Sequence, residues 1–427
     1  MLNVYGSLLI FITCFIIFAY GRIHRTVAAM LGATAMLIFG TSRGFYTQEM
    51  AVNAIDFNTI GLLFGMMIIV AVLRQTGFFR YLAIKGVKLA KGDPWKLLVA
   101  LGFITAFVSM IIDNVTTVLL ISPMTLLISD ILGISPVPIL IGEVILSNVG
   151  GVATMVGDPP NIMIGSASGF TFNSFIMHLM PISLLASGVS LIALKIIFAS
   201  QLQKRKDKIR QILHMREKEA IRDKISLLKC LLILAFVVAL FATEEIHGIK
   251  PALDAILGAA LTLIIVRPKV KEVFSRVEWS ILLFFGALFV MVGGVDKAGT
   301  LKIFGSKLQY VSSNLLSLSL IFLWVSFVLS AFVDNIPYTA AMIPVIKHLK
   351  ISGLDIEPLW WALAIGAGFG GNGTPVGSSA GVIVMGLSEK TKFPFTFKDW
   401  IRSAGVISLL TGAVATLVFI VCFSWFC

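Results

Sequence analysis

Acidic and amide side chains stand together inside long apolar stretches of this chain. Asp113 and Asn114 lie in "SMIIDNVTTVLLISP", and no Lys or Arg occurs between Leu97 and Leu194. A carboxylate at the centre of a membrane helix costs about 2.5–3.5 kcal/mol on insertion scales, so it is retained only if it is paired, neutralised or used. Such a carboxylate can bind a proton or Na⁺, because burial disfavours the bare charge. Alternatively, it accepts N–H bonds at the start of a helix and serves as a cap.

The same pair recurs in the second half of the chain. The stretch "DNVTT" at 113–117 has a counterpart in "DNIPYT" at 334–339, and "GGVATMVGDPPNIMIG" at 150–165 has one in "GGNGTPVGSSAGVIVMG" at 370–386. The landmarks keep their order and a nearly constant offset, so we interpret the chain as a tandem duplication. We expect a first repeat at 1–199, a basic linker at 200–229 and a second repeat at 230–427.

These landmarks carry groups that suit a cation and a small polar solute. Asn114 and Asn335 each offer a donor and an acceptor. Asp158, in "GDPPN", is a third acid that the second copy lacks, and this asymmetry makes it the best candidate for the chemistry of a coupling ion. Glu143 is left open between facing the pathway and pairing with a neighbouring helix. We predict that H⁺ or Na⁺ is the coupling ion, without a resident metal or cofactor, and that its ligands are Asp113, Asp158, Asp334 and Asn161.

The elements that position these residues are membrane helices. The chain has 427 residues, of which 58% are hydrophobic and only 13% charged, with a mean hydropathy of +0.97. One soluble core cannot bury that much apolar side chain. The stretch 97–130 is interrupted by Asp-Asn, so we expect a re-entrant hairpin there. We therefore predict an all-α polytopic membrane protein with two repeats, each having five crossings, one of them broken (137–165 in the first), plus a hairpin. Five is odd, so the repeats must be inverted.

The basic residues give the predicted orientation. With the N-terminus outside, loops on the inner side hold 27 of the 34 Lys and Arg residues, as the positive-inside rule requires. The basic run at 203–224 is then a cytoplasmic loop of a protein in the cell (inner) membrane. It does not indicate nucleic-acid binding, because no folded soluble module accompanies it.

Inverted repeats, broken helices and polar residues within the membrane are typical of a secondary transporter, not of an enzyme. The sequence contains no GxxxxGK[ST] phosphate loop, so we expect an ion gradient to drive transport. A scaffold without transport activity is the alternative from another class. It is disfavoured because a scaffold has no use for acids in broken helices.

The stretches "DNVTTVLLISPMT" (113–125) and "GEVILSNVGGVATMVGDPPNIMIG" (142–165) resemble the ion transporter superfamily. The branch in question holds ArsB-type arsenite permeases, NhaD-type sodium/proton antiporters and P proteins. This resemblance implies arsenite or antimonite efflux driven by the proton gradient, with Na⁺/H⁺ antiport as the alternative. It also implies a small inorganic substrate, a homodimer and, as in some arsenite pumps, an ATPase subunit as partner.

The tips are also similar, more loosely, to those of dicarboxylate/sodium symporters. Carried over from that similarity, the residues that line the substrate site are Asn114, Thr116, Thr154, Asn335, Thr339 and Thr374. Asp113 and Asp334 stand where those symporters have Ser, and the sequence shows no Arg or Lys nearby. Both features oppose an anion, so a carboxylate or oxyanion symporter is the third hypothesis.

Overall fold

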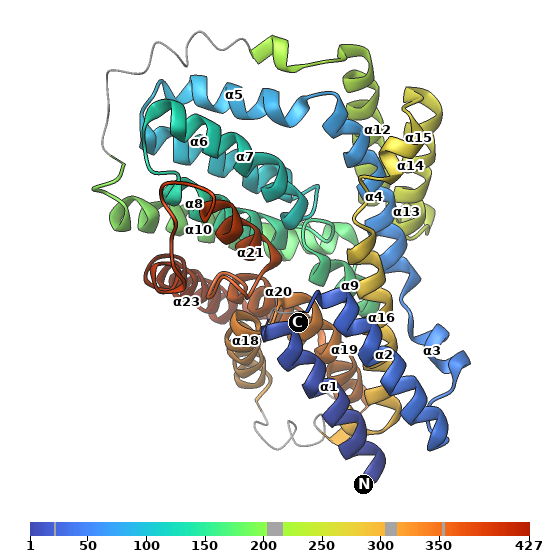
Figure 1. Ribbon diagram of the computed structural model, residues 1–427. Coiled ribbons are helices and arrows are strands. Elements are labelled where there is room, and N and C mark those ends of the chain that lie inside the picture. The colour runs from blue at the N-terminus through green and yellow to red at the C-terminus, as the bar shows by residue number, and fades with distance from the viewer. Residues whose placement is uncertain (21–22, 203–216, 304–313, 352–354) are drawn as a thin grey trace.

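The described residues fold into helices joined by loops, with no strands among them. The computed structural model describes residues 1–20, 23–202, 217–303, 314–351 and 355–427 (Figure 1). The first half contains α1 (Leu2–Tyr20), α2 (Arg25–Ser42), α3 (Gln48–Ala54), α4 (Phe57–Gln75), α5 (Phe78–Ala90), α6 (Pro94–Ser109), α7 (Asn114–Leu132), α8 (Val137–Val152), α9 (Pro159–Ser168) and α10 (Phe172–Ile197).

The second half, as far as it is described, repeats this order of elements. It contains η1 (Glu217–Ala220), α12 (Lys224–Ala242), α13 (Glu244–His247), α14 (Pro251–Val266), α15 (Val270–Phe274), α16 (Trp279–Lys297), α18 (Leu315–Phe332), α19 (Asn335–Ile351), α20 (Glu357–Gly370), α21 (Ser379–Ser388), α22 (Phe397–Trp400), η2 (Ile401–Gly405), α23 (Val406–Val421) and η3 (Phe423–Trp425).

Eight of the described helical stretches are long and apolar enough to cross a membrane. They are α2, α4, α7, α10, α12, α16, α18 and the stretch from Phe397 to Val421. Shorter apolar stretches lie in α1, α6, α8, α14 and α21. Both the long and the shorter apolar helices carry large exposed apolar side chains, such as Ile196 in α10 and Phe107 in α6, which suit contact with lipid. The prediction of an all-α, multi-pass membrane protein is confirmed.

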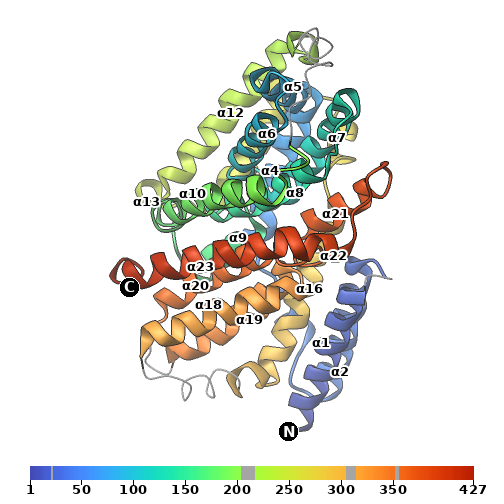
Figure 2. The same ribbon diagram turned by 90° about the vertical axis from the view of Figure 1, so that its left-hand side faces the viewer.

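The two halves pack against each other in matching pairs. Helix α4 packs on α14, and its counterpart α16 packs on α2. In the same way α7 packs on α21, and α19 packs on α9. Figure 2 shows α6, α7 and α12 in the upper part and α18, α19 and α1 in the lower part, with α10 and α23 side by side between them. This exchange of partners is what a two-fold relation between two repeats produces.

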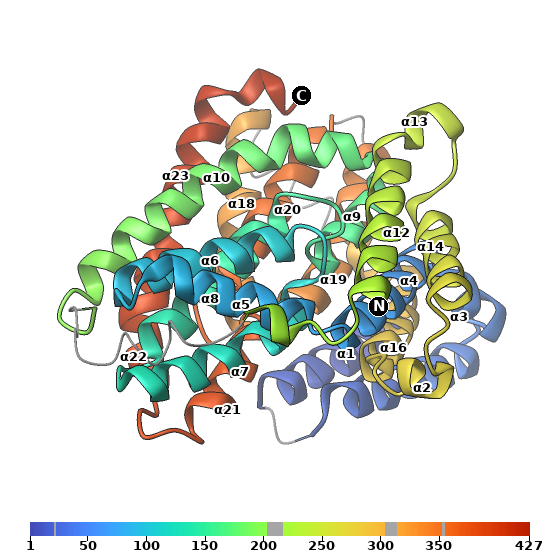
Figure 3. The same cartoon turned by 90° about the horizontal axis from the view of Figure 1, so that it is seen from above.

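The helices form two groups when seen from above (Figure 3). We call α1–α4, α12, α14 and α16 the outer bundle, and α6–α10, α18–α21 and α23 the hairpin core. Both hairpins and both broken helices belong to the hairpin core. The groups touch where α4 meets α9, where α16 meets α19 and where α12 meets α10.

Each hairpin is bound closely to the broken helix that follows it. A methyl group added at Gly150 in α8 would lie 2.5 Å from the carbonyl oxygen of Ala106 in α6. The equivalent distance is 2.3 Å between Gly370 in α20 and Phe327 in α18. Small residues at such positions let two helix backbones approach each other within a membrane. The glycines therefore fix each hairpin against its neighbour.

Two details of the predicted topology differ from the structure. The charge count places the six basic residues of 74–96 in a loop on the inner side, but this stretch contains α5, which packs on α6, α7 and η1. Its buried Phe79, Ala83 and Val87 follow a helical period, while Arg80 and Lys85 interrupt the apolar run that marks a membrane helix. Nearly half of the predicted linker, residues 203–216, lies outside the described residues, and α12 already begins at Lys224.

Candidate substrate and ion site

Both hairpin tips meet at one carboxylate. Asn114, at the start of α7, donates its side-chain N–H to Asp158 Oδ1 at 3.2 Å. Asn335, at the start of α19, donates to both Asp158 oxygens at 3.3 Å. Asp158 is 1% exposed and lies in the break between α8 and α9. The two repeats and the first break thus converge on a single buried acid.

The local sequence explains why this carboxylate is free to face the tips. Asp158 precedes α9, and Pro159 and Pro160 occupy the first turn of that helix, where they bring no N–H group. Asp158 consequently makes no capping bond with its side chain. At the equivalent position of the second repeat, Ser378 does cap its helix by accepting from the Gly381 N–H. The positive end of the α9 dipole also favours a negative charge here.

A chain of amides extends from this carboxylate across the repeat interface. Asn114 also donates to Asn148 Oδ1 at 2.9 Å. Asn148 in turn donates to Asn372 Oδ1 at 2.7 Å and to Ser378 Oγ at 3.0 Å. Sequence reasoning did not name Asn148, Asn372 or Ser378. Asn148 and Asn372 could have been found from their positions within two residues of the Gly-Gly pairs that mark the breaks.

Several buried polar atoms of this region have no hydrogen-bond partner in the described part of the protein. They are Asn114 Oδ1, Asn161 Oδ1, Asn372 Nδ2 and Thr339 Oγ1. Buried polar atoms are rarely left unsatisfied, so the site is suited to a ligand, an ion or water. Amide and carboxylate oxygens are ligands that hard cations accept, and these atoms therefore fit Na⁺ as well as a proton on Asp158.

The tip acids are engaged in capping. Asp113 Oδ1 accepts from the Thr116 N–H at 2.9 Å, and Asp334 Oδ1 accepts from the Ile336 N–H at 3.1 Å. Both acids therefore have the geometry of N-caps, the alternative to cation binding that the sequence left open. Their role in ion coupling stays a prediction.

The expectation that no basic residue lies near the tips is wrong. Arg25, at the start of α2, places Nη1 3.1 Å from Asp334 Oδ2 and also bonds to Ser379 Oγ. Ser379 Oγ donates to the same carboxylate at 2.9 Å. Arg25 is 309 positions from Asp334 in the sequence, so inspection of the residues around the tip did not reveal it. The ion pair neutralises Asp334 and removes one of the two objections to an anionic substrate.

The four threonines predicted to line the substrate site differ in their positions and hydrogen bonds. Thr154 Oγ1 donates to the Met110 carbonyl at 2.5 Å, and Thr374 Oγ1 donates to the Ala331 carbonyl, so both fasten a break to the end of a hairpin helix. Thr116 lines a narrow crevice beside Asp113, and Thr339 is buried in α19. Of the six predicted substrate residues, Asn114 and Asn335 are the two that the structure shows hydrogen-bonded to the central carboxylate.

Asn161 and Glu143 hold the scaffold of the site together. Asn161 donates to the carbonyls of Val152 and Thr154 at 3.0 and 2.9 Å, and so closes the break. Glu143 is fully buried in α8 and accepts from Ser122 and Thr125 of α7. Its geometry favours pairing with a neighbouring helix, the second of the two alternatives left open for Glu143.

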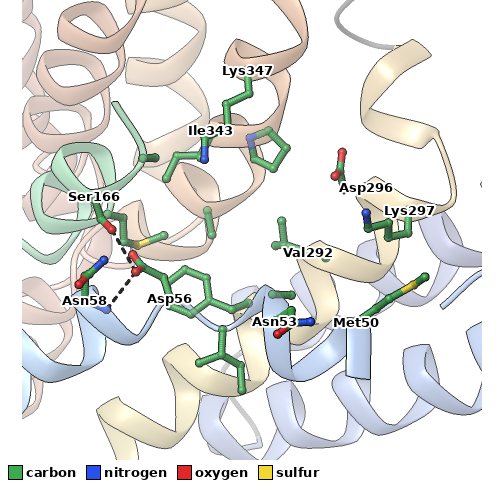
Figure 4. Close-up of a pocket in the computed structure, with 18 of the residues that line it drawn as sticks. Met50, Asn53, Asp56, Asn58, Ser166, Val292, Asp296, Lys297, Ile343 and Lys347 are labelled. Atoms are coloured by element: carbon green, nitrogen blue, oxygen red, sulfur yellow. Dashed lines mark hydrogen bonds between the residues drawn. The ribbon is translucent and has the colours of Figure 1, made fainter. Parts of the chain in front are cut away.

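Two cavities of unequal size lie in pseudo-symmetric positions along α4 and α16. The larger, about 680 Å³, lies between α4, α16, α19 and α9 (Figure 4). The smaller, about 40 Å³, runs between α4, α7 and the start of α16 and is lined by Asp113, Arg74 and Arg276. Val292 and Ala340 of the large cavity correspond, 221 positions earlier, to Ala71 and Leu119 of the small one. The two cavities therefore occupy equivalent positions in the two repeats and differ in size.

Comparison with known proteins places the chain among transporters. The citrate transporter family, CitMHS, matches residues 12–366. An uncharacterised transporter of Mycobacterium tuberculosis is 39% identical over 416 residues, 96% of either chain. A 46 kDa membrane protein of Mycobacterium leprae is 38% identical with the same coverage. The human P protein is 34% identical over 94% of this chain, which spans 58% of that protein.

The fold is also found in a solved structure. The crystal structure of the Alcanivorax borkumensis YdaH transporter superposes with a TM-score of 0.62 and 17% sequence identity, covering 88% of each chain. The similarity to P proteins agrees with the superfamily named from the sequence. The arsenite-permease part of that resemblance stays a prediction.

Proposed function

This chain belongs to the CitMHS citrate transporter family, and we propose on that premise that it is an ion-coupled secondary transporter of a small carboxylate. The observation that supports this most directly is the single buried carboxylate of Asp158, which accepts hydrogen bonds from the tip amides of both repeats. A site shared between two inverted repeats is where secondary transporters bind their substrates.

Asp158 is the proposed site of the coupling cation. Its described partners, Asn114 and Asn335, are neutral amides, so the protein itself does not cancel the negative charge. A charge buried without a compensating partner is costly. Binding of H⁺ or Na⁺ removes that cost, and the oxygens of Asn114 and Asn161 that lack partners are available to a metal cation.

A carboxylate substrate fits once the cation is bound. Arg25 neutralises Asp334, and the cation neutralises Asp158. The amide donors of the site, including the unpartnered Nδ2 of Asn372, can then bond to substrate oxygens. A cation must therefore bind before or together with the anion, and this order couples the two.

Arsenite efflux is the second candidate. The groups that bond to Asp158 are neutral amides, and neutral arsenous acid is a polyol-like solute that such groups can bind. Na⁺/H⁺ antiport is favoured by the same carboxylate together with the free amide oxygens of Asn114 and Asn161.

Transport by purified protein in proteoliposomes tests these proposals. Radiolabelled citrate, arsenite and Na⁺ are supplied in turn under an imposed proton or sodium gradient. We expect citrate uptake that requires one of the two gradients. Arsenite movement or Na⁺/H⁺ exchange without citrate uptake would instead support the corresponding alternative.

The variant Asp158→Asn tests the coupling site, with Asp130→Asn as the matched control. Asp130 is an exposed acid on α7, whereas Asp158 is buried at the centre. We expect Asp158→Asn to fold and to reduce gradient-driven transport to the level of protein-free liposomes, while Asp130→Asn keeps wild-type uptake. Normal coupled uptake by Asp158→Asn would exclude Asp158 as the coupling site.

A further inference from the structure

The large cavity carries two lysines on facing walls. Lys297 comes from the last turn of α16, and Lys347 comes from α19. Figure 4 shows them on separate helices, with Asp56, Asn58 and Ser166 along a third side of the cavity. The cavity therefore presents ammonium groups both from the outer bundle and from the hairpin core.

The acids of this cavity already have partners, whereas the lysines do not. Asp296 Oδ1 lies 2.9 Å from His348 Nε2. Asp56 accepts from the Asn58 N–H at 3.1 Å, from Thr59 and from Ser166 at 3.0 Å. Among the residues that the structure describes, neither Lys297 nor Lys347 has an ion-pair or hydrogen-bond partner. The cavity thus holds two exposed lysines and two acids that do not bond to them, so both ammonium groups can still donate to an anion.

The position of these lysines is unusual for the charge pattern of the chain. The charge count predicts that they lie on the outer side of the membrane, where only 7 of 34 basic residues occur. Basic residues are disfavoured there in short loops. Two of the seven line one cavity, which indicates a role for them other than orientation.

The small cavity, which is equivalent to the large one by the repeat, also has a basic residue in its lining. Arg74 lies in the last turn of α4, as Lys297 lies in the last turn of α16, its repeat counterpart. Arg74 and Arg276 line the small cavity beside Asp113. A basic residue from the last turn of the equivalent helix therefore lines each of the two cavities.

We infer that the large cavity is an anion-binding vestibule, in which Lys297 and Lys347 hold a carboxylate from the outer solution before it reaches the tips. This inference rests on the proposed function. The cavity, at about 680 Å³, is larger than a molecule with two or three carboxylates needs. Two ammonium groups on different walls suit a substrate with more than one carboxylate better than a monocarboxylate.

Uptake kinetics in proteoliposomes test the vestibule. Citrate is the probe, and the variants are Lys297→Gln, Lys347→Gln and their double mutant. Lys350→Gln is the matched control, because Lys350 is an exposed lysine on the same helix as Lys347 but does not line the cavity. Lys297→Arg and Lys347→Arg keep the charge.

We expect each single variant to raise KM for citrate about 5- to 10-fold with little change in kcat, and the double mutant to raise it further. The arginine variants and Lys350→Gln should stay near wild type, and the effect should shrink at high ionic strength. An equal rise of KM in Lys350→Gln, or unchanged KM in the double mutant, would overturn the inference. Absence of citrate uptake in the wild-type protein would contradict the proposed function instead.

Discussion

Asp113, which is partly buried, and Asp158, which is fully buried, are both acids of the first repeat, but their hydrogen bonds differ in kind. Asp113 bonds to the backbone of its own helix, whereas Asp158 bonds to side chains from both repeats. Sequence patterns located both acids because a carboxylate in an apolar stretch is conspicuous. The sequence patterns could not show which acid caps a helix and which one faces the site, because this role depends on the hydrogen-bond donors that the fold brings close to each carboxylate.

The cap at the first tip can be tested at Asp113. Asn is as good an N-cap as Asp, and Ala lacks the acceptor. We expect Asp113→Ala to lower the free energy of unfolding by about 1 kcal/mol, while Asp113→Asn stays close to wild type. Thermal unfolding in detergent measures both. Equal destabilisation by the two substitutions would show that the charge, and not the capping bond, stabilises the tip.

The Arg25–Asp334 ion pair gives a second prediction. In Arg25→Met the half-buried Asp334 loses a charged partner, and we expect a loss of about 1.5–3 kcal/mol of stability. In Arg25→Met with Asp334→Asn the uncompensated charge is removed, while Asn can still accept from the Ile336 N–H. We therefore expect the double variant to recover most of the loss. A double variant less stable than Arg25→Met would contradict this account.

Hairpins, breaks and long helices were predictable at the scale of elements. Asp-Asn interruptions and Gly- and Pro-rich strings mark where helices end, and they do so independently of the fold around them. Helix α5 was missed because Arg80 and Lys85 lower its hydropathy, although its apolar face is buried against the hairpin. Segment length and hydropathy identify membrane-spanning helices, but they do not identify an amphipathic helix such as α5 that packs against other helices.

Close packing of α6 on α8 predicts a difference between two glycines. Gly150 faces the Ala106 carbonyl, whereas nothing lies within 4 Å of the position that a side chain at Gly188 would occupy in α10. We expect Gly150→Ala to cost about 1–3 kcal/mol of stability through overpacking. Gly188→Ala should gain about 0.5–1 kcal/mol through helix propensity. Thermal unfolding of the two variants in detergent measures both effects. A Gly150→Ala variant as stable as wild type would contradict the close approach of α8 to α6.

The duplication was recognisable at the scale of the whole molecule, because its landmarks recur at a nearly constant offset. The partners across the repeat interface were not. Asn148 and Asn372 hydrogen-bond to each other although they are 224 positions apart, and Arg25 reaches Asp334 from α2. Such contacts follow from the two-fold arrangement of helices, and no local pattern encodes them.

Opposite orientation of the repeats can be tested by thiol labelling. Ser42 and Ser275 are exposed and flank equivalent connections, one after α2 and the other between α14 and α16. With Cys422 and Cys427 replaced by Ser, we expect an impermeant maleimide to label Ser42→Cys in intact cells. Ser275→Cys should react only after permeabilisation. Labelling of both from the same face would exclude inverted repeats.

The glycine contacts between each hairpin and its broken helix constrain how the protein moves. With Gly150 against Ala106 and Gly370 against Phe327, neither hairpin has room to slide along its neighbour. A turnover that closes one cavity and enlarges the other must then displace hairpin and broken helix together as one rigid piece. The relative movement then takes place between the outer bundle and the hairpin core, where α9 and α19 meet α4 and α16 and where Arg25 must separate from Asp334 or move with it.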